Sequence, residues 1–189
     1  MLDLTKQLKE LKKLKNNLEK KDEILIVSDL DDTIFCRKEQ LEDNELLRNN
    51  RGADGIRVIL EQIGIENFIE KYYKGKSFPK TITDKMISGK DLILTAGEIN
   101  LQTSKIKALN LENINHSIVW DGEKKPFELV RYVVEDLAYI PSKIIIYEDR
   151  PEYFIENKRL IEDFLGTTLE IILVEMIDNN SEAQIKRVA

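Results

Sequence analysis

The sequence contains little of what several large classes of protein require. Among its 189 residues there are one cysteine, Cys36, and one histidine, His116. A single cysteine cannot form a disulfide within the chain, and neither a cysteine-rich nor a histidine-based zinc site can be built from one residue of each kind. Ser-His or Cys-His catalysis could use only His116. The chemistry of this chain must therefore be sought mainly in other side chains.

Positive charge is also scarce, with 29 lysines and arginines against 35 aspartates and glutamates and a net charge of −6. We therefore expect no strong nucleic-acid footprint, although a local basic patch is compatible with this composition. No run of about 18 apolar residues is present, so we expect no membrane span. The first residues lack the apolar core of a signal peptide. These features predict a cytoplasmic protein of one domain with a small insertion.

Residues 1–22 have the pattern of an amphipathic N-terminal helix. Leucines recur along this segment at helical spacing, at Leu4, Leu8, Leu11, Leu14 and Leu18. Most of the lysines between them lie off that stripe. We interpret the leucines as packing on the body of the fold. A short coiled-coil contact or a nucleic-acid arm are the alternatives.

Short apolar runs rich in β-branched residues alternate with helical patterns along the rest of the chain. Five runs predict strands, at 24–29, 91–95, 117–120, 143–148 and 169–175. They lack polar alternation, which is typical of strands buried on both faces of a parallel sheet. Helical patterns separate them at 100–109, 126–138 and 151–165. Strands that alternate with helices indicate βαβ units, so we expect an α/β fold.

The segment 38–80 interrupts this alternation, because it contains no convincing strand. Helical pieces are predicted near 41–48, 55–63 and 65–73. We interpret most of the segment as a small helical insertion over the sheet, which leaves 23–37 and 81–189 to form the core. Alternatively, one of its helices is the ordinary crossover to the second strand.

Acidic, hydroxyl and lysine side chains follow the ends of the predicted strands. These residues are Asp29, Asp31, Thr95, Lys125, Glu148 and Asp149. Because ligands bind at the carboxyl ends of the strands in open α/β sheets, we expect these groups to converge. Carboxylates without histidine or cysteine suit Mg²⁺, whereas a hydroxyl and a lysine suit an anion. The set predicts a phosphoryl group bound against Mg²⁺, with two acids that divide nucleophilic attack and proton transfer.

Four short motifs at these strand ends follow a fixed order along the chain. They are Asp29–Thr33, Leu92–Thr95, Lys125-Pro126 and Ile144–Asp149. Their order and content resemble the four motifs of the haloacid dehalogenase (HAD) superfamily, and the resemblance covers roughly residues 23–176. It implies a Rossmann-like parallel sheet with the strand order 5-4-1-2-3, and it implies that the 38–80 insertion is a small helical cap.

The resemblance implies roles for the four acids. Asp29 would be the nucleophile that forms an aspartyl-phosphate, and Asp31 would be the general acid and then the base that activates water. Mg²⁺ would be held by Asp29, by the backbone carbonyl of Asp31 and by Asp149, with Glu148 beside it. The acidic pair is Glu-Asp here, where the family pattern has Asp-Asp, so the metal site would depend on Asp149.

The resemblance also implies a phosphate-binding set. Thr95, with Ala96 directly after it, and Lys125 would hold the phosphoryl oxygens. Lys124 is the alternative phosphate lysine, and we favour Lys125 because it directly precedes the proline that opens the helix. Position 32 is an aspartate, where many members of the superfamily have glycine.

The function implied by the resemblance is that of a Mg²⁺-dependent phosphohydrolase acting on a phosphomonoester. Its substrate would be a nucleotide, a polynucleotide end or a small metabolite, so the expected partner is a phosphorylated small molecule or a nucleic-acid end. The stretch 147–154 has a weaker likeness to polynucleotide 3′-phosphatase and RNA-repair-like HAD domains, in which an arginine follows the acidic pair, as Arg150 does here. Arg150 would either cap this loop or reach the substrate. The alternative function is a non-catalytic HAD-fold module that binds a phosphorylated partner.

Several residues outside the motifs are expected to have structural roles. Cys36 is interpreted as a small packing residue, and Trp120 as part of the core, with a base-stacking platform as the alternative. Tyr72 and Tyr73 in the insertion are expected to pack. His116 precedes the third predicted strand, away from the acids.

Overall fold

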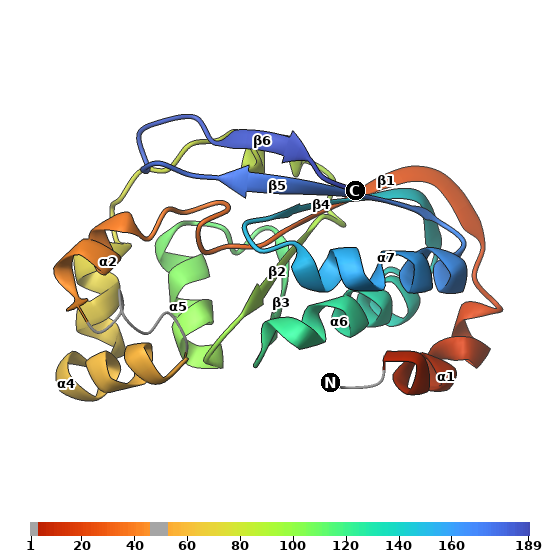
Figure 1. Cartoon of the computed structure of the whole chain (residues 1–189), viewed down its shortest axis with the longest axis horizontal. Helices are drawn as coiled ribbons and strands as arrows, with labels where there is room; N and C mark the ends of the chain where they lie inside the picture. The colour runs from red at the N-terminus through yellow and green to blue at the C-terminus, as the bar shows by residue number, and fades with distance from the viewer. Residues whose placement is uncertain (1–3, 46–52) are drawn as a thin grey trace.

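Six strands form a single sheet with helices on both faces in the computed structural model, which describes residues 4–45 and 53–189 (Figure 1). The strands are β1 (Lys20–Ser28), β2 (Leu92–Ala96), β3 (Asn115–Val119), β4 (Ile140–Glu148), β5 (Thr168–Glu175) and β6 (Gln184–Arg187). Their order across the sheet is β3-β2-β1-β4-β5-β6. Neighbouring strands from β3 to β5 pair in parallel. The predicted α/β class with a mostly parallel sheet is confirmed.

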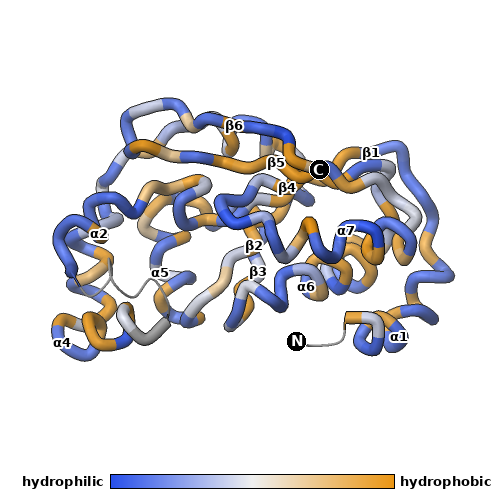
Figure 2. The backbone as a smooth tube through the Cα atoms, viewed as in Figure 1, coloured by the Kyte–Doolittle hydropathy of each residue, from blue (hydrophilic) through white to orange (hydrophobic). Residues whose placement is uncertain are grey.

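The sixth strand corrects the expectation of five. β6 pairs with β5 in the antiparallel direction and all four of its residues are exposed. Ile185 is its one apolar residue, so the segment has no apolar run to mark it as a strand. Figure 2 shows hydrophobic residues along much of β5 and mainly hydrophilic residues along β6. Such a polar edge strand is typical of the way in which sheets protect their open edges.

Successive residues of the central strands serve opposite faces of the sheet. In β1, Leu25 and Val27 belong to the core on one face, whereas Ile26 packs against the core on the other. Strands buried on both faces lose the alternation of polar and apolar residues, which explains their continuous apolar sequence.

The first face is covered by helices from both ends of the chain. They are α1 (Leu4–Lys15), α6 (Lys125–Arg131), the π-helical turn η3 (Tyr132–Leu137) and α7 (Glu152–Leu165). The prediction of one helix over 1–22 is wrong at its C-terminal end, because Lys20 and Lys21 already pair with β4. Leu8 is buried and Leu14 is half exposed, so the apolar stripe is narrower than the leucine spacing predicts.

The second face is covered by α5 (Ile99–Ala108) and by helices of the segment 38–80. In that segment the structure describes α2 (Lys38–Asp43) and α4 (Ala53–Tyr72), followed by the short turn η1 (Thr83–Lys85). Gly64, with a φ of 77°, divides α4 at the boundary between the two predicted pieces 55–63 and 65–73. The predicted piece near 41–48 lies partly outside the described residues.

The helices of this segment share one hydrophobic core with the sheet. Phe68 and Tyr73 belong to the same buried cluster as Ile93 of β2 and Leu101 of α5. Among the helices in the described segments, none is long and apolar enough to cross a membrane.

Candidate active site

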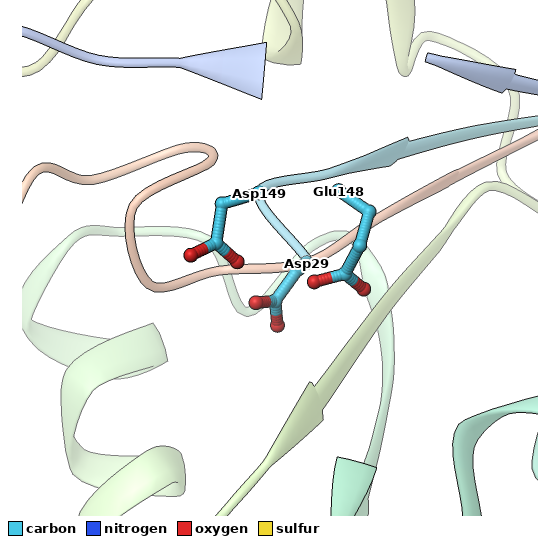
Figure 3. Close-up of side chains that lie close together, drawn as sticks. All are labelled: Asp29, Glu148 and Asp149. Carbon is cyan, nitrogen blue, oxygen red and sulfur yellow. The ribbon is translucent and has the colours of Figure 1, made fainter. Parts of the chain in front are cut away.

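Strand register brings the acids of two separate motifs together. Ser28 at the end of β1 pairs with Tyr147 near the end of β4, and the backbone N–H of Asp29 donates to the carbonyl of Tyr147 at 3.0 Å. Asp29 therefore leaves its strand next to Glu148 and Asp149. Figure 3 shows the three carboxylates turned toward one another at this edge of the sheet.

These carboxylates form a compact group, which we call the acidic cluster: Asp29, Glu148 and Asp149. One carboxylate oxygen of each lies within 4.8 Å of the others. The ammonium of Lys125 lies 3.0 Å from Oδ1 of Asp29 and 2.7 Å from Oε2 of Glu148. One lysine thus serves two buried acids, and the cluster keeps an excess of acidic groups.

The protonation of the cluster reflects this excess. Burial and the nearby Asp29 carboxylate raise the pKa of Glu148 well above its ordinary value. The same two causes raise the pKa of Asp149 to about 6. Although burial opposes a charged lysine, Asp29 and Glu148 outweigh it and raise the pKa of Lys125. A cation bound among these acids would offset their mutual repulsion and lower the pKa of both Glu148 and Asp149.

The surroundings of Asp29 also favour a divalent cation at the acidic cluster. Oδ1 of Asp29 is buried and has no hydrogen-bond partner, because the nearby Lys125 ammonium lies outside hydrogen-bonding directions. This oxygen therefore has only an ion pair with a lysine that Glu148 shares, and a divalent cation would supply the further partner that it lacks. Three carboxylates without histidine or cysteine are hard oxygen donors of the kind that Mg²⁺ takes.

Asp31 faces a different set of partners. Its carboxylate accepts hydrogen bonds from Lys105 at 2.6 Å, from the hydroxyl of Tyr73 at 3.1 Å and from Gln102 at 3.3 Å. Burial opposes ionisation of Asp31, but the charges of Lys105 and Arg37 outweigh it and hold the pKa of Asp31 well below its ordinary value. The carboxylate of Asp31 is therefore ionised and lies outside the acidic cluster.

The predicted phosphate residues lie at the same cavity. Thr95 at the end of β2 is buried, and Ala96 follows it at the cavity wall. Lys125 is buried at the start of α6, whereas Lys124 in the preceding turn η2 (Gly122–Lys124) is exposed. Of the two candidate lysines, the structure thus brings only Lys125 to the acids.

Arg150 and Arg37 also line this cavity of about 220 Å³. The side chain of Arg150 is half exposed and its Nε lies 3.5 Å from Asp149. Arg37 pairs with Asp32 at 2.5 Å, and its backbone N–H donates to the same carboxylate at 2.9 Å. Asp32, which adopts a positive φ of 61°, thereby holds the loop after β1 together.

Several of these residues were missed by sequence reasoning. Lys105 and Gln102 lie on α5 and Tyr73 lies in the turn just after α4, and no local pattern shows which of these side chains will meet Asp31. Tyr73 packs as expected, stacked on Phe35 with a ring separation of 4.7 Å, but its hydroxyl also reaches Asp31. The expectation for Trp120 is wrong, because its side chain is 64% exposed just beyond β3, an edge strand.

The structure brings all of the residues singled out from the motifs to one cavity. Its walls include Asp29, Asp31, Thr95, Ala96, Lys125, Glu148 and Asp149. Cys36 is buried as expected, and His116 is exposed on β3 and does not line the cavity. No protein-family model matches the chain, and neither does any curated protein or solved structure with which it was compared.

Proposed function

We propose that the chain is a Mg²⁺-dependent phosphohydrolase of the HAD type that acts on a phosphomonoester through an aspartyl-phosphate. The observation that carries the proposal is the acidic cluster, with Lys125 3.0 Å from Asp29 in a cavity of about 220 Å³. Read from the β5 side, the parallel strands follow the order 5-4-1-2-3, which is the order implied by the HAD resemblance. The packing of α4 beside α5 is consistent with a cap formed by residues 38–80.

In this proposal Asp29 attacks phosphorus. Asp29 is 8% exposed, so it is shielded from bulk water, yet it lines the cavity. The hydroxyl of Thr95 and the ammonium of Lys125 would balance the charge of the equatorial oxygens. The bond between phosphorus and the leaving oxygen breaks as the bond to Asp29 forms. Water then hydrolyses the aspartyl-phosphate and restores Asp29.

Asp29, Asp149 and the backbone carbonyl of Asp31 would hold Mg²⁺, with Glu148 beside them. When bound, the ion supplies positive charge that offsets the repulsion between an anionic nucleophile and an anionic phosphoryl group. Glu148 already pairs with Lys125 at 2.7 Å, which suits a helper that orients the lysine and lends charge to the site.

Asp31 would handle the protons. Its ionised state suits the second half of the cycle, in which it accepts a proton from the attacking water. In the first half the same carboxyl must carry a proton to the leaving oxygen, which its lowered pKa opposes. We therefore expect esters with good leaving groups, which need little protonation, to react fastest in the first half.

Turnover of p-nitrophenyl phosphate with and without Mg²⁺ tests the proposal. We expect hydrolysis that requires Mg²⁺ and stops with a chelator, and Asp149→Asn should weaken the dependence on Mg²⁺ sharply. Asp163→Asn is the matched control, because this aspartate is exposed on α7. Wild-type protein that binds phosphate but shows no turnover at any Mg²⁺ concentration would support the non-catalytic alternative instead. A cytoplasmic location stays a prediction.

A further inference from the structure

A second cavity of about 670 Å³ adjoins the first, and its walls include residues of α2, α4 and α5. The two cavities share five lining residues, namely Asp31, Arg37, Ala96, Asp121 and Gly122. Asp31, the proposed proton-transfer residue, thus lies where one cavity passes into the other. A group that leaves the phosphoryl site past Asp31 would enter the second cavity, whose volume is within the range of small-molecule sites.

The walls of the second cavity are largely apolar. They include Leu41, Ile56, Leu60, Ile65 and Leu101. Trp120 also lines the cavity, and it is the single tryptophan of the chain. Trp120 is 64% exposed and lines the cavity, so its indole can stack on a planar ligand.

The cationic side chains that line this cavity in the described part of the chain already have acidic partners. The pairs are Arg37 with Asp32, Lys105 with Asp31 and Arg57 with Glu61. Glu98 is likewise engaged, because it accepts hydrogen bonds from two backbone N–H groups at the start of α5. Among the described residues of the wall, the buried cations Arg37 and Lys105 are thus committed to acids, which favours an uncharged leaving group over one with further phosphates.

Two buried amide groups at the cavity have unused hydrogen-bonding capacity. Nε2 of Gln40 and Oε1 of Gln102 have no hydrogen-bond partner in the described structure, and both side chains are only 3% exposed. One is a donor and the other an acceptor. If the two amides turn toward the cavity, a flat ligand with both kinds of group at its edge satisfies them, whereas a plain hydrocarbon does not.

From these observations we infer that the second cavity binds a nucleoside, so that the substrate is a nucleoside monophosphate. A nucleobase is flat and uncharged, stacks on aromatic rings, and carries donors and acceptors along its edge. This inference rests on the proposed phosphohydrolase function for its catalytic meaning, but binding of the nucleoside itself requires no turnover.

Fluorescence of Trp120 tests the inference directly, because the chain has no other tryptophan. Purified full-length protein is titrated with adenosine, guanosine and cytidine, each without phosphate, and with ribose as the control. We expect saturable quenching by at least one nucleoside and none by ribose. Failure of all three nucleosides to bind, with p-nitrophenyl phosphate still hydrolysed, would overturn the inference and leave the proposed function standing. Nucleoside binding without any hydrolysis of p-nitrophenyl phosphate would support the nucleoside site and overturn the proposed function.

Calorimetry on variants separates stacking from a general loss of structure. Trp120→Ala should weaken nucleoside binding by about tenfold, whereas Trp120→Phe should retain most of the affinity. Ile87→Ala is the control, because Ile87 is 86% exposed and does not line either cavity. Equal affinity in wild type and Trp120→Ala would contradict the inference. So would tighter binding of a 3′-phosphorylated oligonucleotide than of a nucleoside monophosphate, because it would indicate a polynucleotide end as the ligand.

Discussion

At the scale of single residues, Asp29 and Asp31 are close in sequence but have different partners. Asp29 faces Lys125, Glu148 and Asp149 across the end of β4, whereas Asp31 is held by a lysine and a tyrosine from helical segments. The first environment gathers acids around one lysine and suits a metal. The second satisfies a single ionised carboxylate. The two acids of one motif thus differ in their surroundings, which supports the two different roles that we propose for them.

Breaking the pair of Lys105 and Asp31 should destabilise the fold measurably. Both side chains are at most 10% exposed and their charged atoms lie 2.6 Å apart. Lys105→Met removes the closest cation from the buried Asp31 carboxylate, so the free energy of unfolding should fall by about 3 kcal/mol. Urea denaturation measures this change. Adding Asp31→Asn to Lys105→Met should recover part of the loss, and a double variant no more stable than Lys105→Met would contradict the pairing.

Cys36 should be chemically inert in the folded protein. Burial raises the pKa of its thiol above the ordinary value, so the reactive thiolate is rare at pH 8. Alkylation by iodoacetamide at pH 8 should be at least about tenfold slower in the native protein than in urea. The rate should rise as pH increases toward the raised pKa. Equal rates in native and unfolded protein would show that Cys36 is accessible.

The residues of the site could be predicted from sequence where the strand ends determine their position. Asp29, Thr95 and Asp149 follow apolar runs directly, and parallel strands bring such ends to one edge. Lys105 and Tyr73 could not be found in this way, because their approach to Asp31 depends on how α5 and α4 pack. Exposure of Trp120 depends on β3 lying at the edge of the sheet, which the apolar run does not reveal.

At the scale of elements, α1 is attached to the fold by one side only. Leu8 is 3% exposed and Leu14 is 50% exposed, although both fit the leucine spacing. Leu8→Ala should lower the free energy of unfolding by about 2–5 kcal/mol, because it removes buried methyl groups and leaves a cavity. Leu14→Ala, the matched control, should change it by less than about 0.5 kcal/mol. Equal effects in thermal or urea denaturation would place α1 away from the sheet.

The central strands could be predicted from the sequence, whereas the start of β1 and the edge strand β6 could not. The central strands were found because continuous apolar runs such as 143–148 have few other interpretations. The start of β1 at Lys20 was missed because charged residues continue the strand beyond its buried part, where they pair with Ile140 and Pro141 of β4. β6 was missed because an exposed edge strand needs no apolar residues.

At the scale of the whole molecule, metal binding should stabilise the fold. The acidic cluster joins β1 to β4 in the middle of the sheet, so a cation there links segments that unfolding separates. Mg²⁺ should raise the melting temperature. The increase should grow with Mg²⁺ concentration, because the ion binds the folded state and not the unfolded chain. Asp149→Asn should remove most of the increase, whereas Asp163→Asn should not. No change in melting temperature at millimolar Mg²⁺ would argue against a resident metal.

Trapping of the phosphoenzyme tests most directly whether Asp29 is the nucleophile. Wild-type protein is mixed with an activated phosphomonoester in the presence of Mg²⁺, quenched rapidly, and analysed by peptide mass spectrometry. Asp31→Asn should accumulate more phosphoenzyme than wild type, because release of phosphate is slowed while activated esters still react. We predict phosphate on Asp29 and neither phosphoenzyme nor turnover in Asp29→Asn. Phosphate on Cys36 or His116, or wild-type activity in Asp29→Asn, would contradict the account.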